Sequence, residues 1–499
     1  MRLSGFYLRY GEGLDEGANR RVHARLRALL KDPHPAVTDL IPGYASLFVE
    51  FDEERASEVE VRAWAEGAPE AGGEAGREIR IPVVYDGPDL AELAEWAGIS
   101  QEEVIRRHAG RTYRVFAIGF TPGFPFMAEV DPKIARPRRP EPRKRVPAHS
   151  VGIAGRQTGI YPQESPGGWN LIGRTRVRVF DPQREHPFLL EPGDRVRFVP
   201  EEGPVPPPPE PLELIPEEPR DPVLEVLAPG LLDLPLDAGR FLAGRFGLAR
   251  SGPADPYAAR VANRLVGNPP GAPVLELNLL GPELLVLKDA VFAFAGFGVR
   301  VRKNGEEVPA WTSFFARAGD RLAFPPSGRG IRGYLAVAGG FALLRFFGSA
   351  SVDLKGRIGR PLKAGDRLGV AGSAARIAGR GFRPRYVPGS RVRIRLRPGP
   401  QATPEALAAL ASQAFEVEDA DRMGVRLSGE PVPGGEVTSE GVPLGAIQVP
   451  PSGKPILLLA DRGTLGGYAK PALVRPEDLF KAAQLRPGDR VRFVLDSAS

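Results

Sequence analysis

The chain contains no cysteine, so neither a disulfide bond nor thiolate chemistry is available to it. In its 499 residues no apolar run approaches the roughly 20 residues that a membrane-spanning helix needs. The first residues, MRLSGFYLRYGEG, also lack the long apolar stretch and the small-residue cleavage site of a secretory signal. We therefore expect a soluble, cytoplasmic protein with no membrane partner.

Histidine is scarce, and the motifs of several enzyme classes are missing. The sequence has no GxxxxGK[ST] phosphate loop, no GxGxxG directly after a strand, no HExxH and no GxSxG, and it lacks the Gly-Ser-Ser run of amidase-signature enzymes. No two histidines have the spacing of metal ligands on one helix, which disfavours zinc catalysis and a histidine-dependent triad. We predict no metal site. The five histidines are His23, His34, His108, His149 and His186.

Neither sign of charge is in large excess. Lys and Arg number 67 against 61 Asp and Glu, and the net charge of +6 is spread along the chain. Nucleic-acid binding would require a concentrated basic patch or a reading motif, and we find neither. Arginine far outnumbers lysine, and the loops are rich in proline. This bias is typical of heat-adapted proteins, although a GC-rich genome produces part of it.

What the sequence does contain is a repeat. PGDRVRFV occurs at 192–199 and again at 487–494, with the looser relatives RAGDRLAF at 317–324 and KAGDRLGV at 363–370. Gly-Asp favours a turn, and the apolar and charged residues then alternate, as in a strand with one buried face. Four such units predict several related β-barrels in series.

The first copy of the repeat runs into a segment rich in proline and acidic residues, 201–222, which reads as a semi-rigid linker. The first copy therefore ends one module, residues 1–200, and the last copy ends a second, residues 223–499. We predict a mainly β protein with α+β elements. The expected units are a small α/β domain at 1–76, a barrel domain at 77–200, the linker at 201–222, and two further barrel domains at 223–390 and 391–499.

Hydrophobic periodicity predicts only a few helices. Two of them have recognisable starts, because Ser100 with Glu103 forms a capping-box pattern and Thr403 with Pro404 forms an N-cap and first-turn pair. The expected helices span 18–32, 58–67, 89–98, 100–110, 255–267 and 403–413.

Dense stretches of Gly, Pro and polar residues are where we expect functional sites, because such residues cost stability unless the backbone must turn sharply or approach a ligand. They are GFTPGFPFM at 119–127, the segment 136–175, SGPADPYAARVANRLVGN at 251–268, DRMGVRLSG at 421–429, and the segment 437–470.

These stretches carry a family resemblance. Through GFTPGFPF, VPAHSVGIAGRQTGIYP and ESPGGWNLIGRT, the first module resembles allophanate hydrolase subunit 1, also known as the Kip-type kinase inhibitor and as the B subunit of 5-oxoprolinase. Through SGPADPYAARVANRLVGN, DRMGVRLSG, GAIQVPPSGKPILLLADR and GGYAK, the second module resembles allophanate hydrolase subunit 2, or the C subunit of 5-oxoprolinase. The resemblance implies cyclophilin-like β-barrels in tandem and two halves that work as one complex.

The activity that the resemblance implies is the ATP-dependent opening of 5-oxo-L-proline to L-glutamate, together with a partner similar to the separate A subunit of 5-oxoprolinase. ATP is then a co-substrate, and Mg²⁺ is expected to accompany it. Two other functions stay open: a urea- or allophanate-handling protein of the amidolyase type, and a non-catalytic Kip-type regulator that binds a histidine kinase. A homo-oligomer is also open.

Arginine suits phosphate and carboxylate recognition because its planar guanidinium donates two parallel hydrogen bonds. For each arginine the alternative is a solvated surface position. The candidates are Arg138, Arg139, Arg143 and Arg145 in the first module and Arg422, Arg426 and Arg462 in the second.

Other polar residues within the motifs complete the candidate sites. For Tyr161 and Trp169 the alternative is core packing, for Glu164 it is an ordinary turn carboxylate, and for Lys470 a surface lysine. The first-module lining is Gln157, Tyr161, Glu164, Ser165, Trp169, Asn170 and Arg174. The second-module set is Asp421, Gln448, Asp461, Tyr468 and Lys470. Within these sets the proposed catalytic residues are Glu164, Tyr161, Arg174, Asp461 and Lys470.

Three departures from the family pattern bear on the identity of the substrate. His149 stands where the family usually has a small residue. The segment LLDLPLDAGR matches the family only in part, at Asp237 and Arg240, and the loop SVDLKGRIGRPLKAGD at 351–366 is short.

Overall fold

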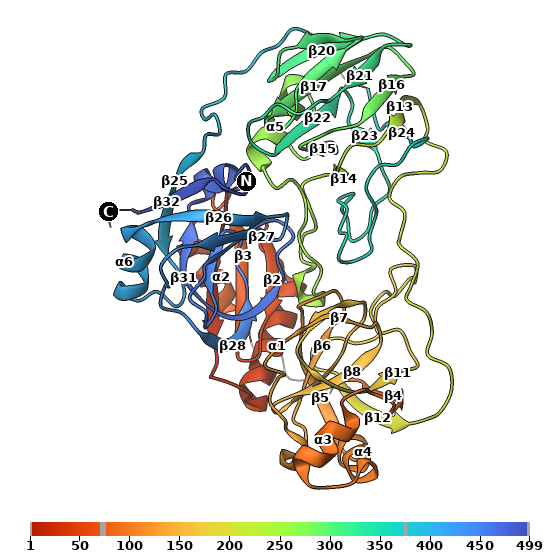
Figure 1. The fold of residues 1–499 in the computed structure, drawn as a ribbon, viewed down its shortest axis with the longest axis vertical. Coiled ribbons are helices and arrows are strands. Elements are labelled where there is room, and N and C mark those ends of the chain that lie inside the picture. Colours follow the sequence, from red (N-terminus) through yellow and green to blue (C-terminus); the bar gives the residue numbers. More distant parts are fainter. Residues whose placement is uncertain (1, 70–75, 374–376, 497–499) are drawn as a thin grey trace.

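The computed structural model describes residues 2–69, 76–373 and 377–496. It is mainly β, with several β units in tandem, as the sequence predicts. Four units can be followed in Figure 1: the N-terminal unit (2–69, red), the closed barrel (78–200, orange to yellow), the central unit (222–370, green) and the C-terminal unit (391–495, blue). Residues 70–75, where we expected the first domain boundary, lie outside the described residues.

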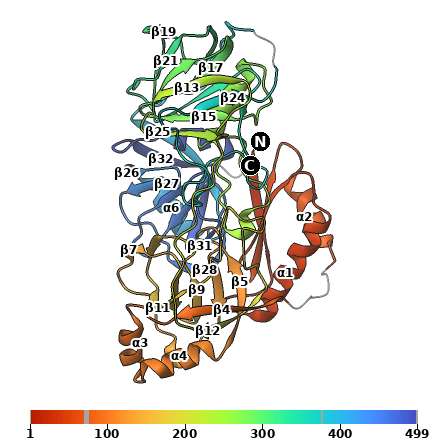
Figure 2. The ribbon, with the colours of Figure 1, turned by 90° about the vertical axis from the view of Figure 1, so that its right-hand side faces the viewer.

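The N-terminal unit is a three-stranded antiparallel sheet with two helices. In the amphipathic helix α1, Val22, Leu26 and Leu29 are buried, and the Asp15 carboxylate caps it by accepting the Ala18 N–H at 2.7 Å. The unit lies beside the column formed by the other three (Figure 2). In sheet order its strands are β1 (Leu3–Arg9), β3 (Ser46–Asp52) and β2 (Val37–Pro42), and its helices are α1 (Glu16–Lys31) and α2 (Glu58–Gly67).

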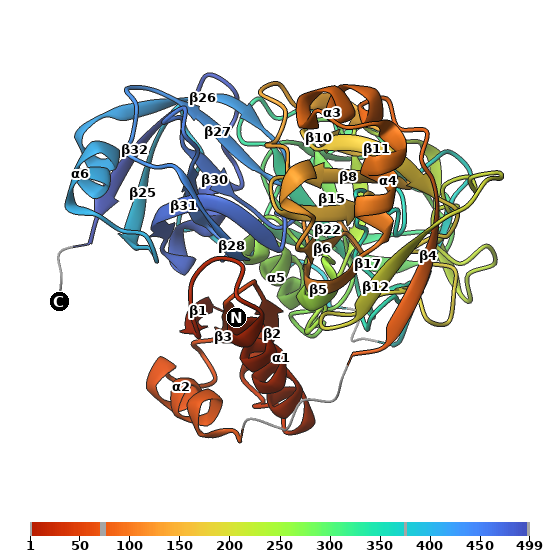
Figure 3. The same ribbon diagram turned by 90° about the horizontal axis from the view of Figure 1, so that it is seen from below.

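The closed barrel has seven strands in the order β11-β4-β12-β5-β6-β9-β8. Its helices α3 and α4 pack at one end (Figure 3), and the Ser100 hydroxyl caps α4 by accepting the Glu103 N–H at 3.2 Å, as the capping-box pattern predicts. The barrel strands are β4 (Glu78–Val84), β5 (Thr112–Ile118), β6 (Pro125–Ala128), β8 (Ser150–Ala154), β9 (Gln157–Ile160), β11 (Asn170–Thr175) and β12 (Arg195–Pro200). Beside them are α3 (Leu90–Ala97), α4 (Gln101–Ala109), the 3-10 turn η1 (Pro132–Ile134) and the pair β7 (Arg143–Val146) and β10 (Ser165–Gly167).

The central unit contains two sheets and one long helix. The seven-stranded sheet has the order β19-β18-β21-β16-β13-β24-β23, and the five-stranded sheet has the order β14-β15-β22-β17-β20. The elements are β13 (Pro222–Ala228), β14 (Asp233–Leu236), η2 (Gly244–Phe246), α5 (Pro256–Leu265), β15 (Val274–Asn278), β16 (Glu283–Val286), β17 (Ala290–Gly296), β18 (Val301–Lys303), β19 (Glu306–Val308), β20 (Thr312–Ala316), β21 (Arg321–Ala323), β22 (Arg332–Val337), β23 (Phe341–Ala342) and β24 (Arg367–Val370).

The C-terminal unit is an eight-stranded sheet, β25-β32-β26-β27-β30-β29-β31-β28, with a further pairing between β25 and β31. Thr403 caps its helix α6 as predicted, accepting the Ala406 N–H at 3.2 Å. The elements are β25 (Arg391–Pro398), α6 (Pro404–Ser412), β26 (Ala414–Ala420), β27 (Gly424–Ser428), β28 (Glu436–Gly441), β29 (Ala446–Val449), β30 (Ile456–Leu458), β31 (Leu465–Val474), η3 (Pro476–Asp478), α7 (Leu479–Ala482) and β32 (Arg490–Leu495).

The sequence repeat is a turn followed by a strand in all four copies. In each copy the Asp carboxylate accepts the backbone N–H three residues before it, at 2.8–2.9 Å, and the preceding Gly has a positive φ that favours glycine. The two full copies also occupy equivalent places: β12 pairs parallel with β4 and antiparallel with β5, and β32 pairs parallel with β25 and antiparallel with β26. The turns are Gly193–Asp194, Gly319–Asp320, Gly365–Asp366 and Gly488–Asp489.

The proline-rich segment 201–222 runs along the central unit. Leu214 and Ile215 are buried, and the Leu212 N–H donates to the Arg357 carbonyl oxygen at 2.9 Å. The segment is thus packed against the second module. Within the described residues, no helix is both long and apolar enough to cross a membrane.

Candidate active site at the junction of the two modules

The two modules meet through a buried carboxylate, Glu50 of β3. Its Oε1 accepts a hydrogen bond from the Thr38 hydroxyl at 2.9 Å and pairs with Arg250 of the second module. Its Oε2 lies 3.2 Å from Nη2 of Arg462, whose Nε–H also donates to the Val442 carbonyl oxygen at 2.8 Å. Arg462, a predicted phosphate-binding residue, is therefore engaged in the contact between the modules.

A second buried carboxylate, Glu440 of β28, connects the C-terminal unit to the first strand of the chain. Glu440 Oε2 accepts from Nη1 of Arg9 at 2.8 Å. Its Oε1 accepts from Nε2 of Gln401 at 2.7 Å and lies 3.1 Å from Nζ of Lys470. The Lys470 side chain has no exposed surface, so it is not a surface lysine, and its burial lowers its pKa while Glu440 opposes that shift.

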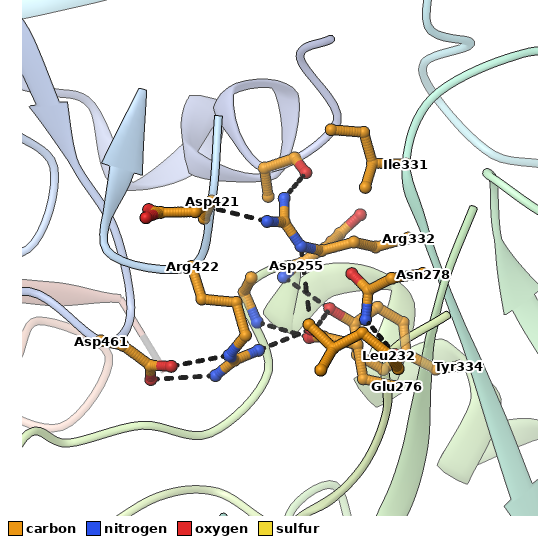
Figure 4. A network of polar contacts seen from close by, with 12 residues as sticks. Leu232, Asp255, Glu276, Asn278, Ile331, Arg332, Tyr334, Asp421, Arg422 and Asp461 are labelled. Carbon is orange, nitrogen blue, oxygen red and sulfur yellow. Dashed lines mark hydrogen bonds and ion pairs between the residues drawn. The ribbon is translucent and has the colours of Figure 1, made fainter. Parts of the chain in front are cut away.

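A third charged network joins the central and C-terminal units (Figure 4). At its centre Glu276 of β15, fully buried, accepts from Nη1 of Arg422 at 2.6 Å and from the Tyr334 hydroxyl at 2.7 Å. Arg422 also donates to both carboxylate oxygens of Asp461, at 2.8 and 3.0 Å. Burial alone would lower the pKa of Arg422, but Asp461 and Glu276 raise it well above its usual value. Two predicted residues, Arg422 and Asp461, are thus in direct contact.

The same network continues on its far side (Figure 4). Arg332 of β22 lies 3.7 Å from Glu276 and donates from Nη2 to the Asp421 carbonyl oxygen at 3.0 Å. Asp255, the N-cap of α5, accepts from Nε2 of Gln484 at 2.8 Å, and burial raises its pKa to about 6. The motifs that begin near 251 and 421 are thereby brought to one interface.

Four charged residues act on one another's pKa values, and we call them the junction cluster: Arg240, Asp353, Lys355 and Asp461. Lys355 extends from the central unit to the closed barrel, where its Nζ donates to the Phe120 carbonyl oxygen at 2.6 Å and lies 4.9 Å from the centre of the Phe120 ring. Burial lowers the pKa of Lys355, with the carboxylates of Asp353 and Asp461 acting in the opposite direction. Burial raises the pKa of the Asp353 carboxyl, and the positive charge of Arg240 opposes that rise.

The loop that carries Lys355 is held by the two residues that match the family only in part. Asp237 Oδ1 accepts from the Ser351 hydroxyl at 2.8 Å, and Asp237 Oδ2 accepts the Ala350 N–H at 2.8 Å. Arg240 donates to the Ser351 carbonyl oxygen. Asp237 and Arg240 therefore fix the backbone just before Lys355.

A buried amine that donates to a backbone carbonyl and feels two nearby carboxylates can stabilise negative charge that develops on a bound molecule or donate a proton to it. The junction cluster draws on the motif GFTPGFPFM, the LLDLPLDAGR segment, the short 351–366 loop and the LADRGT stretch. It is therefore our candidate active site.

The aromatic candidates of the first module lie in a packed cluster next to this site. The Tyr161 ring is 5.1 Å from Phe124 and 6.5 Å from Phe120, and the Trp169 ring is 5.4 Å from Phe124. Both are buried, and burial raises the pKa of Tyr161 to about 12. Tyr161 thus packs behind the Phe120 residue that accepts from Lys355.

The remaining buried and half-buried candidates of the first module lie within the barrel unit and most of them make structural contacts. Gln157 accepts from the Tyr44 hydroxyl at 2.6 Å, Asn170 donates to two backbone carbonyl oxygens, and Ser165 is buried on β10. Arg139 and Arg143 both donate to Asp89, whose other oxygen accepts the Leu171 N–H at 2.7 Å. These arginines connect the start of α3 with β11.

Several other candidates lie on the surface, away from the junction. Glu164 pairs with Arg145 at 2.8 Å, with 52% and 79% of the side chains exposed, which fits the turn-carboxylate alternative. Arg174 pairs with Asp86, Arg426 pairs with Asp419, and Arg138 is exposed.

The other second-module candidates lie on β-structure of the C-terminal unit. Asp421 accepts the N–H groups of Met423 and Gly424 at 2.7 and 2.8 Å and so shapes the turn before β27. Gln448 is buried on β29, and Tyr468 is half-buried on β31.

Sequence reasoning missed Lys355, Asp353, Glu276 and Glu50. Lys355 and Asp353 lie in a loop that stands out in the sequence only for its length, and Glu276 and Glu50 lie within apolar strands with nothing in the sequence to mark their role. Among the residues that the structure describes, no group of three or more His, Cys, Asp or Glu could hold a metal ion.

Comparison with known proteins gives matches in both modules. Residues 2–190 match the family model "carboxyltransferase domain, subdomain C and D", and residues 246–495 match "carboxyltransferase domain, subdomain A and B". The crystal structure of TTHA0988 superposes with a TM-score of 0.96 at 55% identity, covering 99% of this chain and 100% of that one.

Curated relatives match one module each. The B subunit of 5-oxoprolinase from Bacillus subtilis is 42% identical over 216 residues, which cover 39% of this chain and 89% of that protein. The C subunit of 5-oxoprolinase from Haemophilus influenzae is 34% identical over 281 residues, 52% of this chain and 86% of that protein. Urea amidolyase of Lachancea kluyveri is 31% identical over 306 residues, 54% of this chain but 17% of that protein.

Proposed function

Since this chain belongs to the carboxyltransferase-domain family and carries both its C/D and its A/B subdomains, we propose that it is a fused form of the B and C subunits of 5-oxoprolinase. It would open 5-oxo-L-proline to L-glutamate in the cytoplasm at the expense of ATP, with a separate A subunit. The observation that carries the proposal is coverage: one chain matches 89% of a 5-oxoprolinase B subunit, together with 86% of a C subunit.

The contacts between the modules support joint action. Glu50 of the first module pairs with Arg250 and Arg462 of the second, and Glu440 of the second module pairs with Arg9 of the first. Breaking such buried pairs typically costs roughly 3–5 kcal/mol each. These pairs hold the two modules in a fixed arrangement. Such an arrangement suits a reaction whose catalytic groups are supplied by both modules.

The chemistry sets two demands. A five-membered lactam resists hydrolysis because its amide is resonance-stabilised, so the γ-phosphoryl group of ATP is transferred to the lactam oxygen, which makes the carbon electrophilic. Water then adds to that carbon, and the C–N bond breaks with a proton delivered to nitrogen, which leaves an acyl phosphate. A second water hydrolyses the acyl phosphate to the carboxylate and free phosphate. The protein must place the reactants and stabilise the negative charge that develops.

The junction cluster suits both demands. Lys355 is placed to stabilise developing negative charge or to deliver the proton, and Asp461, held by Arg422, is placed to accept one. Tyr161 packs against Phe120 and so supports the carbonyl oxygen that binds Lys355. Lys470 supports the site indirectly, because it pairs with Glu440 in the contact between the modules. Glu164 and Arg174, which are exposed and engaged with Arg145 and Asp86, are the weaker catalytic candidates. Mg²⁺ would arrive with ATP rather than in a resident site.

The test is ADP release by the purified chain, with and without the host's A subunit, using 5-oxo-L-proline, urea, allophanate or no substrate. Turnover that requires both 5-oxo-L-proline and the A subunit supports the proposal. Turnover with urea or allophanate supports the second candidate, an amidolyase-type role, which the likeness to urea amidolyase over 54% of the chain favours. A folded chain that turns over no substrate argues against both.

A further inference from the structure

A cavity of about 680 Å³ lies where the N-terminal, central and C-terminal units meet. In Figure 1 this is the region around the chain's N-terminus, between the green and blue units. Its wall includes the 251–268 motif at the start of α5 and the segment of η3 and α7. The volume is in the range of sites for small molecules of roughly 300–1,000 Å³.

One part of the wall is aromatic. Tyr257 of α5 and Phe480 of α7 both line the cavity, are half-buried, and have ring centres 5.2 Å apart. The Trp311 ring, 5.8 Å from Tyr257, supports this wall from behind. A flat ring of a ligand can stack on such a surface.

Most charged groups of the wall already have partners within the protein. Arg395 donates to Asp478 at 2.9 Å, and Arg2 lies 3.4 Å from Glu54 and 3.3 Å from Glu477. These pairs contribute little attraction for a charged ligand, because each cation is neutralised in place.

Two arginines are different. Arg260 donates from Nε to the Pro256 carbonyl oxygen at 3.2 Å, and the only carboxylate near its Nη groups, within the part of the chain that the structure describes, is Glu54, at 3.9 Å. Within the same residues, the Arg385 guanidinium has no ion pair or hydrogen bond. Both arginines lie close to the aromatic part of the wall. Arg260 follows Tyr257 by one turn of α5, and the Arg385 backbone N–H donates to the Tyr257 hydroxyl at 3.4 Å. A stacking wall and two available guanidinium groups therefore lie side by side.

We propose that this cavity binds a nucleoside triphosphate, with its base on the Tyr257–Phe480 wall and its phosphates at Arg260 and Arg385. Nucleotides combine a flat ring with a chain of phosphates, and guanidinium groups bind phosphate oxygens in pairs. The inference rests on the proposed function, which consumes ATP, and adds a location that no phosphate-loop motif marks.

The experiment is isothermal titration of Mg-ATP into the whole chain, with adenosine and inorganic tripolyphosphate as probes of the two halves of the ligand. The variants are Arg260→Ala and Arg385→Ala. Their matched controls are Arg264→Ala, one turn further along α5, and Arg383→Ala, two residues from Arg385; neither Arg264 nor Arg383 lines the cavity.

We expect each cavity variant to weaken Mg-ATP binding about 10-fold or more and the controls to change it less than about twofold. Tyr257→Leu should weaken adenosine without changing tripolyphosphate. The proposal is overturned if the chain binds no Mg-ATP either alone or with the A subunit, or if cavity and control variants bind alike. If ATP-dependent turnover of 5-oxo-L-proline persists with an unchanged KM for ATP in the cavity variants, the location is wrong while the proposed function stands.

Discussion

Replacing Arg422 with methionine should weaken the contact between the central and C-terminal units. Methionine keeps much of the length of the side chain but removes its bonds to Asp461, to Glu276 at 2.6 Å and to the Gly252 carbonyl oxygen at 2.7 Å. Glu276 has no exposed surface and would keep Arg332, 3.7 Å away, as its cationic neighbour. Removal of one member of a buried pair costs roughly 3–5 kcal/mol, and because Arg332 remains we expect the lower end, about 3 kcal/mol.

The matched control is Arg426→Met, four residues along the chain. Arg426 pairs with Asp419 on the surface, where both side chains are more than half exposed, so its loss should cost less than about 1 kcal/mol. The measurement is native-state hydrogen exchange in β15 and β27, since a chain of several units need not unfold in one step. Equal free energies of opening in the two variants would show that the buried Arg422 pair does not hold the two units together. Adding Glu276→Gln to Arg422→Met should restore part of the loss.

Three further outcomes are expected. Burial raises the pKa of Asp39, which accepts the Gly244 N–H, to about 7, above its unfolded value. The stability that the protonated group contributes is therefore present near pH 4 and is lost by at most about 1.4 kcal/mol per pH unit as the pH rises toward 7. Thermal unfolding between pH 4 and 8 should show a smaller loss of stability with rising pH in Asp39→Asn than in the parent chain, and equal losses would contradict the raised pKa. Lys355→Met should lower kcat for ADP release about 100-fold with the fold intact by circular dichroism, whereas Lys363→Met, exposed in the same loop, should not. Trp169→Ala should destabilise the closed barrel by about 3 kcal/mol in urea unfolding, and a loss of activity without destabilisation would contradict its role in the core.

Local chemistry made much of the fold predictable. The Gly-Asp turn is stabilised by a local bond, because the Asp carboxylate accepts an N–H only three residues away. The turn can therefore be predicted from the sequence of each copy alone. The caps at Ser100 and Thr403 are equally local, and the structure confirms both. Such features depend on neighbours in sequence and not on the rest of the molecule.

The site was less predictable because its contacts join distant parts of the chain. Lys470 was expected either to be catalytic or to lie on the surface, yet its burial depends on Glu440 and Arg9, which no local pattern reveals. The ammonium group of Lys355 is held by the carbonyl oxygen of Phe120, which lies 235 residues earlier in the chain. Asp461 and Arg422 were found because they lie in motifs dense in glycine and polar residues, whereas Glu276 lies in an apolar strand and resembles any buried position.

The pairing of Glu50 also determines the order in which the protein can mature on the ribosome. Its cationic partners follow 200 and 412 residues later in the chain. A nascent first module therefore presents the Glu50 carboxylate before its cationic partners have been synthesised, and translation must almost finish before Arg462 can pair with it. Joining the two modules into one chain keeps the late partner tethered to the early one, so the interval of exposure is set by the elongation rate and not by the concentration of a second protein.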